Sequence, residues 1–154
     1  MEWGIRSRNV MESKSIKHSV AFVIYNQDHT KILVVRRPLD DDNLPNIWGL
    51  PAGSLKENET FEGAVIRSAK DKLGVEVRIV KLISEGEIER NRHILHMKEF
   101  EIEIQEGDIL VPQSVSGVTQ YSEWKWGQPG DLIEAAQKDS LCSRLYLESV
   151  KVNW

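Results

Sequence analysis

Stretches of β-branched and other apolar residues, divided by turn residues, predict strands in the first third of the chain. Residues 19–25 and 31–36 are both rich in Val, Ile and Leu, and the Asn-Gln-Asp-His stretch at 26–29 between them offers turn chemistry. This order predicts a β-hairpin. Pro38 ends the second strand, because proline cannot donate to a ladder, and a short apolar stretch follows at 47–50 after a polar loop.

The segment from Thr60 to Gly74 carries the signals of an amphipathic helix. The Thr60 hydroxyl can accept a hydrogen bond from a free amide of the first turn, and Gly74 is typical of a helix end. At about 100° per residue, five apolar positions fall on one arc, and we expect this arc to face a sheet. These positions are Phe61, Val65, Ile66, Ala69 and Leu73.

The second half of the chain mixes strands with helices. Residues 75–83 and 99–104 alternate apolar and polar side chains, as strands with one solvent-exposed face do. We expect these two strands to be neighbours. A further strand is predicted at 123–126, a helix at 129–137, and a last helix from Ser140 to about residue 147. Without regular βαβ alternation, this order predicts an α/β protein of the α+β type, with a mixed sheet sandwiched between helices.

Composition limits the number of domains and the compartment. A chain of 154 residues fits one domain, and no apolar run approaches the roughly 20 residues that cross a bilayer. The first ten residues hold no apolar stretch of signal-peptide length. We therefore expect a soluble single domain at 16–154 with no membrane partner. Residues 1–15 are interpreted as a disordered leader, or as a start that belongs at Met11.

Charge and cysteine content exclude further classes. The formal net charge is −4, which argues against a nucleic-acid partner, because binding a phosphate backbone needs a positive face. A small phosphorylated ligand stays compatible, since a local basic pair can hold it. The single cysteine, Cys142, cannot form an intrachain disulfide, and no Cys/His cluster has zinc spacing. A reducing cytoplasm fits this composition.

Residues 53–75 resemble the Nudix box, which reads glycine, five residues, glutamate, seven residues, then Arg-Glu-apolar-any-Glu-Glu-any-Gly-apolar. The residues at matching spacing are Gly53, Glu59, Arg67, Gly74 and Val75. Upstream, the Trp-Gly-Leu-Pro-Ala-Gly stretch at 48–53 is similar to the Trp-any-Leu-Pro-Gly-Gly approach of the family. Downstream, Glu-Trp-Lys-Trp at 123–126 resembles its late strand. The likeness to the Nudix (MutT-like) hydrolase superfamily runs from roughly residue 16 to 138.

The resemblance implies a metal site, and this chain departs from it. In the family, the box glutamates bind Mg²⁺ or Mn²⁺, and three oxygen ligands at i, i+3 and i+4 converge on one hard cation. The corresponding residues here are Ser68, Asp71 and Lys72. The local formal charge therefore rises from −3 to about zero, which weakens the attraction for a divalent ion. Asp71 alone can still hold Mg²⁺ together with waters and substrate phosphates.

The family's site roles carry over to five positions. Gly53, through its backbone carbonyl, Asp71 and Ser68 are the candidate metal ligands. The candidate catalytic residues are Asp71, Glu59 and Arg67. Glu59 braces Arg67 in the family, and a purely architectural ion pair is the simpler interpretation of these two residues. Gly53 has the alternative role of a tight turn that needs no Cβ.

The candidate substrate-binding residues lie outside the box. Arg36 and Arg37 end the second strand, where related proteins place a substrate-contacting arginine, and a guanidinium suits a phosphate or a base edge. Trp48 is a candidate for stacking on a base, with a core or rim position as the alternative. His93 and His96, three residues apart in a strand, face opposite sides, and His96 is the candidate to line a ligand cleft.

Three glutamates alternate onto one strand face and offer a replacement carboxylate, since some Nudix enzymes take their general base from outside the box. A solvated acidic face is the alternative. They are Glu85, Glu87 and Glu89.

Two functions follow from the resemblance. One is hydrolysis of a nucleoside diphosphate linked to another moiety, by metal-activated water, with a weakened Mg²⁺ or Mn²⁺ site. The other is a Nudix-fold module that binds a nucleotide or related metabolite without cleaving it, as a sensor or partner subunit. In both cases the expected partner is a small nucleotide-like diphosphate. The family also makes a homodimer an expectation, although no residue pattern indicates one.

Overall fold

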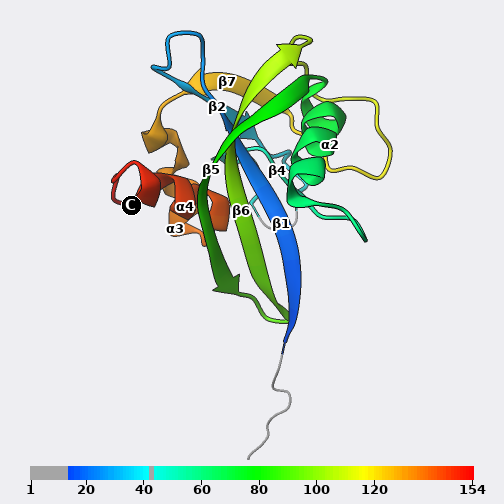
Figure 1. Ribbon diagram of the computed structural model, residues 1–154. Helices are drawn as coiled ribbons and strands as arrows, with labels where there is room; N and C mark the ends of the chain where they lie inside the picture. The colour runs from blue at the N-terminus through cyan, green and yellow to red at the C-terminus, as the bar shows by residue number, and fades with distance from the viewer. Residues whose placement is uncertain (1–13, 42–43) are drawn as a thin grey trace, which may run out of the picture.

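The computed structural model describes residues 14–41 and 44–154, and a long twisted sheet runs through it (Figure 1). The order of its strands is β4-β1-β6-β5. Their bounds are Ser15–Ile24 (β1), Ala52–Ser54 (β4), Glu76–Glu89 (β5) and His93–Glu106 (β6). β1 and β6 are parallel, whereas the other neighbours are antiparallel, so the predicted mixed sheet is confirmed. The predicted leader lies, apart from its last two residues, outside the described residues.

A second, smaller sheet has the order β3-β2-β7. Its strands are β3 (Trp48–Gly49), β2 (Ile32–Arg36) and β7 (Glu123–Gly127). The predicted hairpin between the first two strands of the chain is therefore wrong, since β1 and β2 lie in different sheets and share one bridge, Tyr25 to Ile32. Consecutive residues of both strands are buried, which is typical of strands covered on both faces, and each strand takes its neighbours from distant segments.

Helix α2 (Phe61–Leu73) begins and ends where its capping residues predict. The Thr60 hydroxyl accepts a hydrogen bond from the backbone N–H of Gly63 at 2.9 Å. Gly74 has a φ of 74°, a left-handed conformation that glycine adopts without strain. Local signals therefore fix the position of this helix along the chain.

The buried face of α2 packs on the sheet beside Phe22 and Phe100, and it differs from the predicted arc at one residue. Ile66 is 40% exposed, whereas its neighbour Val65 is fully buried. The arc is centred on Val65 and Ala69, so a residue about 100° further round the helix reaches solvent. The buried residues are Ala64, Val65, Ser68, Ala69 and Leu73.

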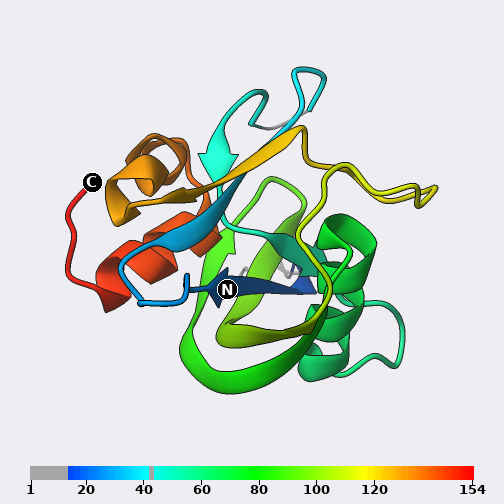
Figure 2. The same cartoon turned by 90° about the horizontal axis from the view of Figure 1, so that it is seen from above.

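The opposite face of the sheet is covered by the C-terminal helices (Figure 2). The predicted helix at 129–137 is two elements, a 3₁₀ turn η2 (Pro129–Leu132) and a short α3 (Ile133–Gln137), and the last helix is α4 (Leu141–Ser149). With α2 on one face and these helices on the other, the sheet is sandwiched as predicted. In the described part of the chain, no helix is long and apolar enough to span a membrane.

β5 and β6 are longer than predicted and form a long antiparallel hairpin. The two predicted strands are indeed neighbours, but pairing continues through charged residues, with Glu85 opposite Lys98 and Glu87 opposite His96. The end of β5 and the starts of β6 and β1 extend past α2 (Figure 1). Polar side chains there are no barrier to strand formation, because the backbone pairing does not need a buried face.

A carboxyl group is buried in the sheet face that α4 covers. Glu99 of β6 is fully buried, and neither of its carboxyl oxygens has a hydrogen-bond partner within the described residues. Burial raises the pKa of Glu99 well above its ordinary value, because the charged form is poorly solvated there. The folded protein therefore keeps this proton at a pH where the unfolded chain releases it.

Glu99 should make the fold less stable at higher pH. Its folded pKa lies above the unfolded one, so its contribution is complete below pH 4.5 and is lost as the pH rises from there through the folded pKa. Glu99→Gln keeps the shape without the charge. We expect it to match the wild type near pH 4.5 and to be more stable at pH 8 by about 1–3 kcal/mol, measured by urea unfolding.

Glu57→Gln is the matched control, because Glu57 is exposed and should leave the pH dependence unchanged. A Glu99→Gln protein that keeps the wild-type loss of stability between the two pH values would contradict the assignment.

Candidate functional site

The site is built where the β4 segment meets helix α2. A Cβ atom added at Gly53 would lie 2.2 Å from the Ser68 hydroxyl oxygen, far inside contact distance. Gly53 lies in strand β4, paired with Val20, so a close approach to the helix explains the glycine here and a turn does not. The backbone of β4 and the helix face at position 68 are therefore in direct contact.

Lys72 holds the carbonyl next to this contact. Its Nζ donates a hydrogen bond to the Ala52 carbonyl oxygen at 2.6 Å and lies 5.3 Å from the centre of the Tyr121 ring. The Tyr121 hydroxyl accepts a hydrogen bond from the Ala52 N–H at 3.0 Å and donates to the Ala52 carbonyl at 3.3 Å. The Lys72 ammonium group thus binds the backbone carbonyl next to Gly53, the residue whose own carbonyl the family resemblance assigns to a metal site.

Glu59 and Arg67 form a bidentate ion pair. Arg67 Nε donates to Glu59 Oε2 at 2.8 Å and Nη2 to Oε1 at 2.9 Å, while Nη2 also donates to the Ser54 carbonyl at 2.8 Å. The hydrogen bond from Arg67 lowers the pKa of Glu59, and the same contact raises the pKa of Arg67. The pair ties the segment after β4 to the middle of α2, in the arrangement expected of a brace.

Asp71 lies beside the brace. Its Oδ2 is 3.8 Å from Arg67 Nη1, and its side chain is 24% exposed. The Gln120 side chain donates to the Asp71 backbone carbonyl at 3.4 Å. Asp71 is thus the one carboxylate among the three box positions, and an arginine is its charged neighbour.

The side chains present do not fit a hard divalent cation. The Ser68 hydroxyl is buried and has no hydrogen-bond partner within the described residues, and Lys72 brings a positive charge. Across residues 14–41 and 44–154, no group of three or more His, Cys, Asp or Glu side chains is arranged to hold a metal ion. Mg²⁺ and Mn²⁺ prefer several oxygen ligands, and of the three ligand positions 68, 71 and 72 only Asp71 supplies a carboxylate.

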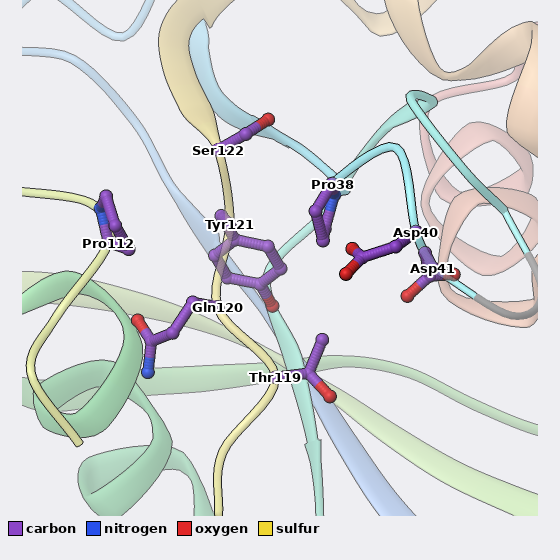
Figure 3. Close-up of a pocket in the computed structure, with 8 residues that line it drawn as sticks. All are labelled: Pro38, Asp40, Asp41, Pro112, Thr119, Gln120, Tyr121 and Ser122. Atoms are coloured by element: carbon purple, nitrogen blue, oxygen red, sulfur yellow. The ribbon is translucent and has the colours of Figure 1, made fainter. Parts of the chain in front are cut away.

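A cleft of about 520 Å³ opens next to this contact, between the segment after β2 and the segment before β7 (Figure 3). The Asp40 carboxylate and the Tyr121 ring extend toward one another from its two sides. Tyr121 therefore belongs both to the cleft and to the Lys72 contact. The lining residues are Pro38, Asp40, Asp41, Pro112, Thr119, Gln120, Tyr121 and Ser122.

The predicted substrate-binding residues are not among those that line this cleft. Arg37 pairs with Asp41 at its edge, with Nη1 3.3 Å from Oδ1. Arg36 pairs with Glu123 at 2.8 Å and lies over the Trp48 ring at 5.5 Å, on the small sheet.

His96 lies elsewhere, against Glu85 and near Phe61, the first residue of α2. Asp71 is ten residues further along the helix, about 15 Å by its rise. Glu85 therefore contacts His96 near the start of α2, far from Asp71.

Sequence reasoning missed Tyr121 and Gln120, which lie in a loop of mixed polar residues with no periodic signal.

Comparisons with known proteins show the family and the fold of this chain. The model of the NUDIX domain family matches residues 16–141. An 8-oxo-dGTP diphosphatase of Proteus vulgaris is 32% identical over 68 residues, which are 44% of this chain and 58% of that protein.

Two solved structures have the same fold. The MutT protein from Methanosarcina mazei Go1 is 18% identical, with 82% of this chain and 90% of that one covered at a TM-score of 0.62. The E. coli ORF135 protein is 19% identical, with 89% and 92% covered at a TM-score of 0.65.

The contact between β4 and α2 should not tolerate a side chain at position 53. Gly53→Ala places a methyl group against the Ser68 hydroxyl, and we expect a loss of about 1–3 kcal/mol in the free energy of urea unfolding. Adding Ser68→Ala should restore part of this loss. Gly49→Ala is the control, because a Cβ there meets no atom within 4 Å. Equal effects of the two glycine substitutions would contradict a tight contact.

Proposed function

Because this chain belongs to the NUDIX domain family, we propose that it binds a nucleoside diphosphate linked to a second moiety and hydrolyses it slowly at most. Nudix hydrolases act on small nucleotide-like diphosphates and generally use divalent metal ions. The observation that carries the proposal is the hydrogen bond from Lys72 to the Ala52 carbonyl. In this proposal, a fixed ammonium group replaces the metal ion as the positive charge that meets the diphosphate.

The chemistry of Lys72 suits this role. A lysine ammonium has three N–H donors, and the Ala52 carbonyl takes one of them. The Lys72 ammonium lies over the Tyr121 ring, 5.3 Å from the ring centre. The Lys72 side chain is partly buried, so water screens its charge less than at the open surface. Within the described residues the other two donors have no hydrogen-bond partner, so they can bind phosphate oxygens in charge-assisted hydrogen bonds.

The cleft beside Tyr121 is the proposed place for the rest of the ligand. Its volume of about 520 Å³ falls within the usual range for small-molecule sites. The Tyr121 ring offers an aromatic face, while Gln120 and Asp40 offer an amide and a carboxylate for hydrogen bonds. A nucleotide with its diphosphate toward Lys72 would place its base or its second moiety among these groups.

Slow hydrolysis follows from the donor set. Activating water with a metal ion requires carboxylates that gather the ion, and positions 68 and 72 provide a buried hydroxyl and an ammonium instead. The second candidate function, a working pyrophosphohydrolase, draws support from Asp71, which is partly exposed and makes only a long 3.8 Å contact with Arg67. The diphosphatase relative, matched over part of its length, supports the same candidate.

Ligand binding should not need a metal ion. We expect methylene-bridged analogues of the common nucleoside diphosphates to bind in EDTA, measured by isothermal titration calorimetry. Lys72→Gln should weaken the best analogue by about 10- to 100-fold, the usual value of a charge-assisted hydrogen bond. Lys70→Gln is the matched control, because Lys70 lies on the same helix, 67% exposed and paired with Glu76. Binding that appears only with Mg²⁺ would overturn the ammonium proposal.

Hydrolysis should be slow and should need millimolar Mg²⁺. We expect Ser68→Glu with Lys72→Glu to raise turnover of nucleoside diphosphate sugars and nucleoside triphosphates, because the pair restores two carboxylates to the helix face. Ser68→Gln with Lys72→Gln is the control for size without charge, and a thermal melt checks that each variant folds. Fast wild-type turnover at micromolar Mg²⁺ would refute the slow-hydrolysis part. No turnover by any folded variant would exclude the hydrolase candidate.

A further inference from the structure

A second cluster of titratable side chains lies away from Lys72 and the cleft, where the strands extend past α2. His18 of β1 and His96 of β6 are direct partners in the parallel register, although they are 78 residues apart in sequence. Their Nδ1 atoms are 2.8 Å apart. Two imidazole nitrogens therefore face each other across neighbouring strands.

The other ring nitrogen of His96 contacts a carboxylate of β5. His96 Nε2 lies 2.6 Å from Glu85 Oε2, and this contact lowers the pKa of Glu85, so the carboxylate is the charged acceptor. His96 Nε2 therefore carries a hydrogen, and in the neutral imidazole Nδ1 is then the nitrogen with a lone pair toward His18. A histidine held by a carboxylate through one nitrogen, with the other nitrogen free to coordinate, is the usual arrangement of a metal-binding imidazole.

Packing holds both rings in place. The Phe61 ring meets His18 and His96 edge-on, with centroids 5.8 and 5.6 Å apart, and the two imidazoles lie 5.0 Å from one another at 88°. His96 is 14% exposed, whereas His18 is exposed, so the pair is open to solvent on the His18 side. The charged neighbours are Lys98, whose Nζ lies 4.5 Å from the centre of the Phe61 ring, and Glu85 and Glu87 of β5.

We propose that His18 and His96 bind a divalent transition-metal ion such as Zn²⁺ or Ni²⁺ through their Nδ1 atoms, while Glu85 stays hydrogen-bonded to His96 Nε2. Two nitrogens at 2.0–2.1 Å from a tetrahedral ion are about 3.3 Å apart, so the pair has to open by roughly 0.5 Å. Rotation of the solvent-exposed His18 side chain provides this opening. The proton on His18 Nδ1 moves through solvent to Nε2, so binding changes the tautomer of His18 and not its charge.

The kind of ion follows from the donors. Imidazole nitrogen favours zinc, nickel and copper, whereas Mg²⁺ favours oxygen. The protein supplies two ligands, and water completes the coordination, so the ion is exchangeable. The site is independent of the proposed function, because Lys72 lies eleven residues beyond Phe61 on α2, about 16 Å along the helix.

Zinc titration of the untagged full chain tests this site. Calorimetry at pH 7.5 should show one saturable Zn²⁺ site, and His18→Asn and His96→Asn should each abolish it. His93→Asn is the matched control in the same strand and should bind Zn²⁺ as the wild type does. Lys72→Gln should also leave zinc binding unchanged, which separates this site from the diphosphate site. Wild-type protein without saturable binding up to millimolar Zn²⁺ would overturn the proposal.

Two further measurements keep the test independent of variant folding. In wild-type protein, imidazole ¹⁵N spectra should show Zn²⁺ shifting the Nδ1 signals of His18 and His96 and leaving those of His29 and His93. Shifts confined to His29 or His93 would refute the site. Glu85→Gln should weaken zinc binding by about 10- to 100-fold, as loss of a carboxylate behind a metal-binding histidine does. Unchanged affinity would remove Glu85 from the site.

Discussion

The candidate site depends on one close approach, that of the Gly53 backbone to the side of helix α2 at Ser68. Because no side chain separates them, the Ala52 carbonyl comes within reach of Lys72, one turn beyond Ser68 on the same helix face. The Glu59–Arg67 pair closes the segment that follows β4 and keeps it against the helix. The family's framework is therefore intact, although its ligand set is changed.

Changing the residues at the three ligand positions while keeping the framework brings the local formal charge from −3 to about zero. In the family, the carboxylates on this helix face bind a cation from solution. In this chain, the positive charge belongs to the side chain of Lys72. An ammonium group cannot polarise water as a divalent ion does, but it can still attract a phosphate. In the proposed function, Lys72 serves ligand recognition, whereas metal-dependent chemistry depends on Asp71 as the remaining carboxylate of the three ligand positions.

Sequence reasoning worked where the signals were local. Thr60 and Gly74 located α2 because a cap is made by neighbouring residues. The prediction of a hairpin between β1 and β2 was wrong because both strands are buried on both faces and pair with distant segments. Tyr121 meets Ala52 across 69 residues, and no motif spacing encodes such a contact. The contact between His18 and His96 was not predicted for the same reason, since strand register and not sequence spacing brings them together.

The peptide group of Ala52 connects two parts of the molecule. Its carbonyl oxygen has two lone pairs, which accommodate the Lys72 ammonium and the Tyr121 hydroxyl together, and its N–H is held by that same hydroxyl. A shift of the loop before β7 would strip the N–H of its partner and leave the carbonyl to Lys72 alone. The cleft and helix α2 thus both contact the peptide group of Ala52, so a ligand that displaced Tyr121 would also change the hydrogen bonding around Lys72.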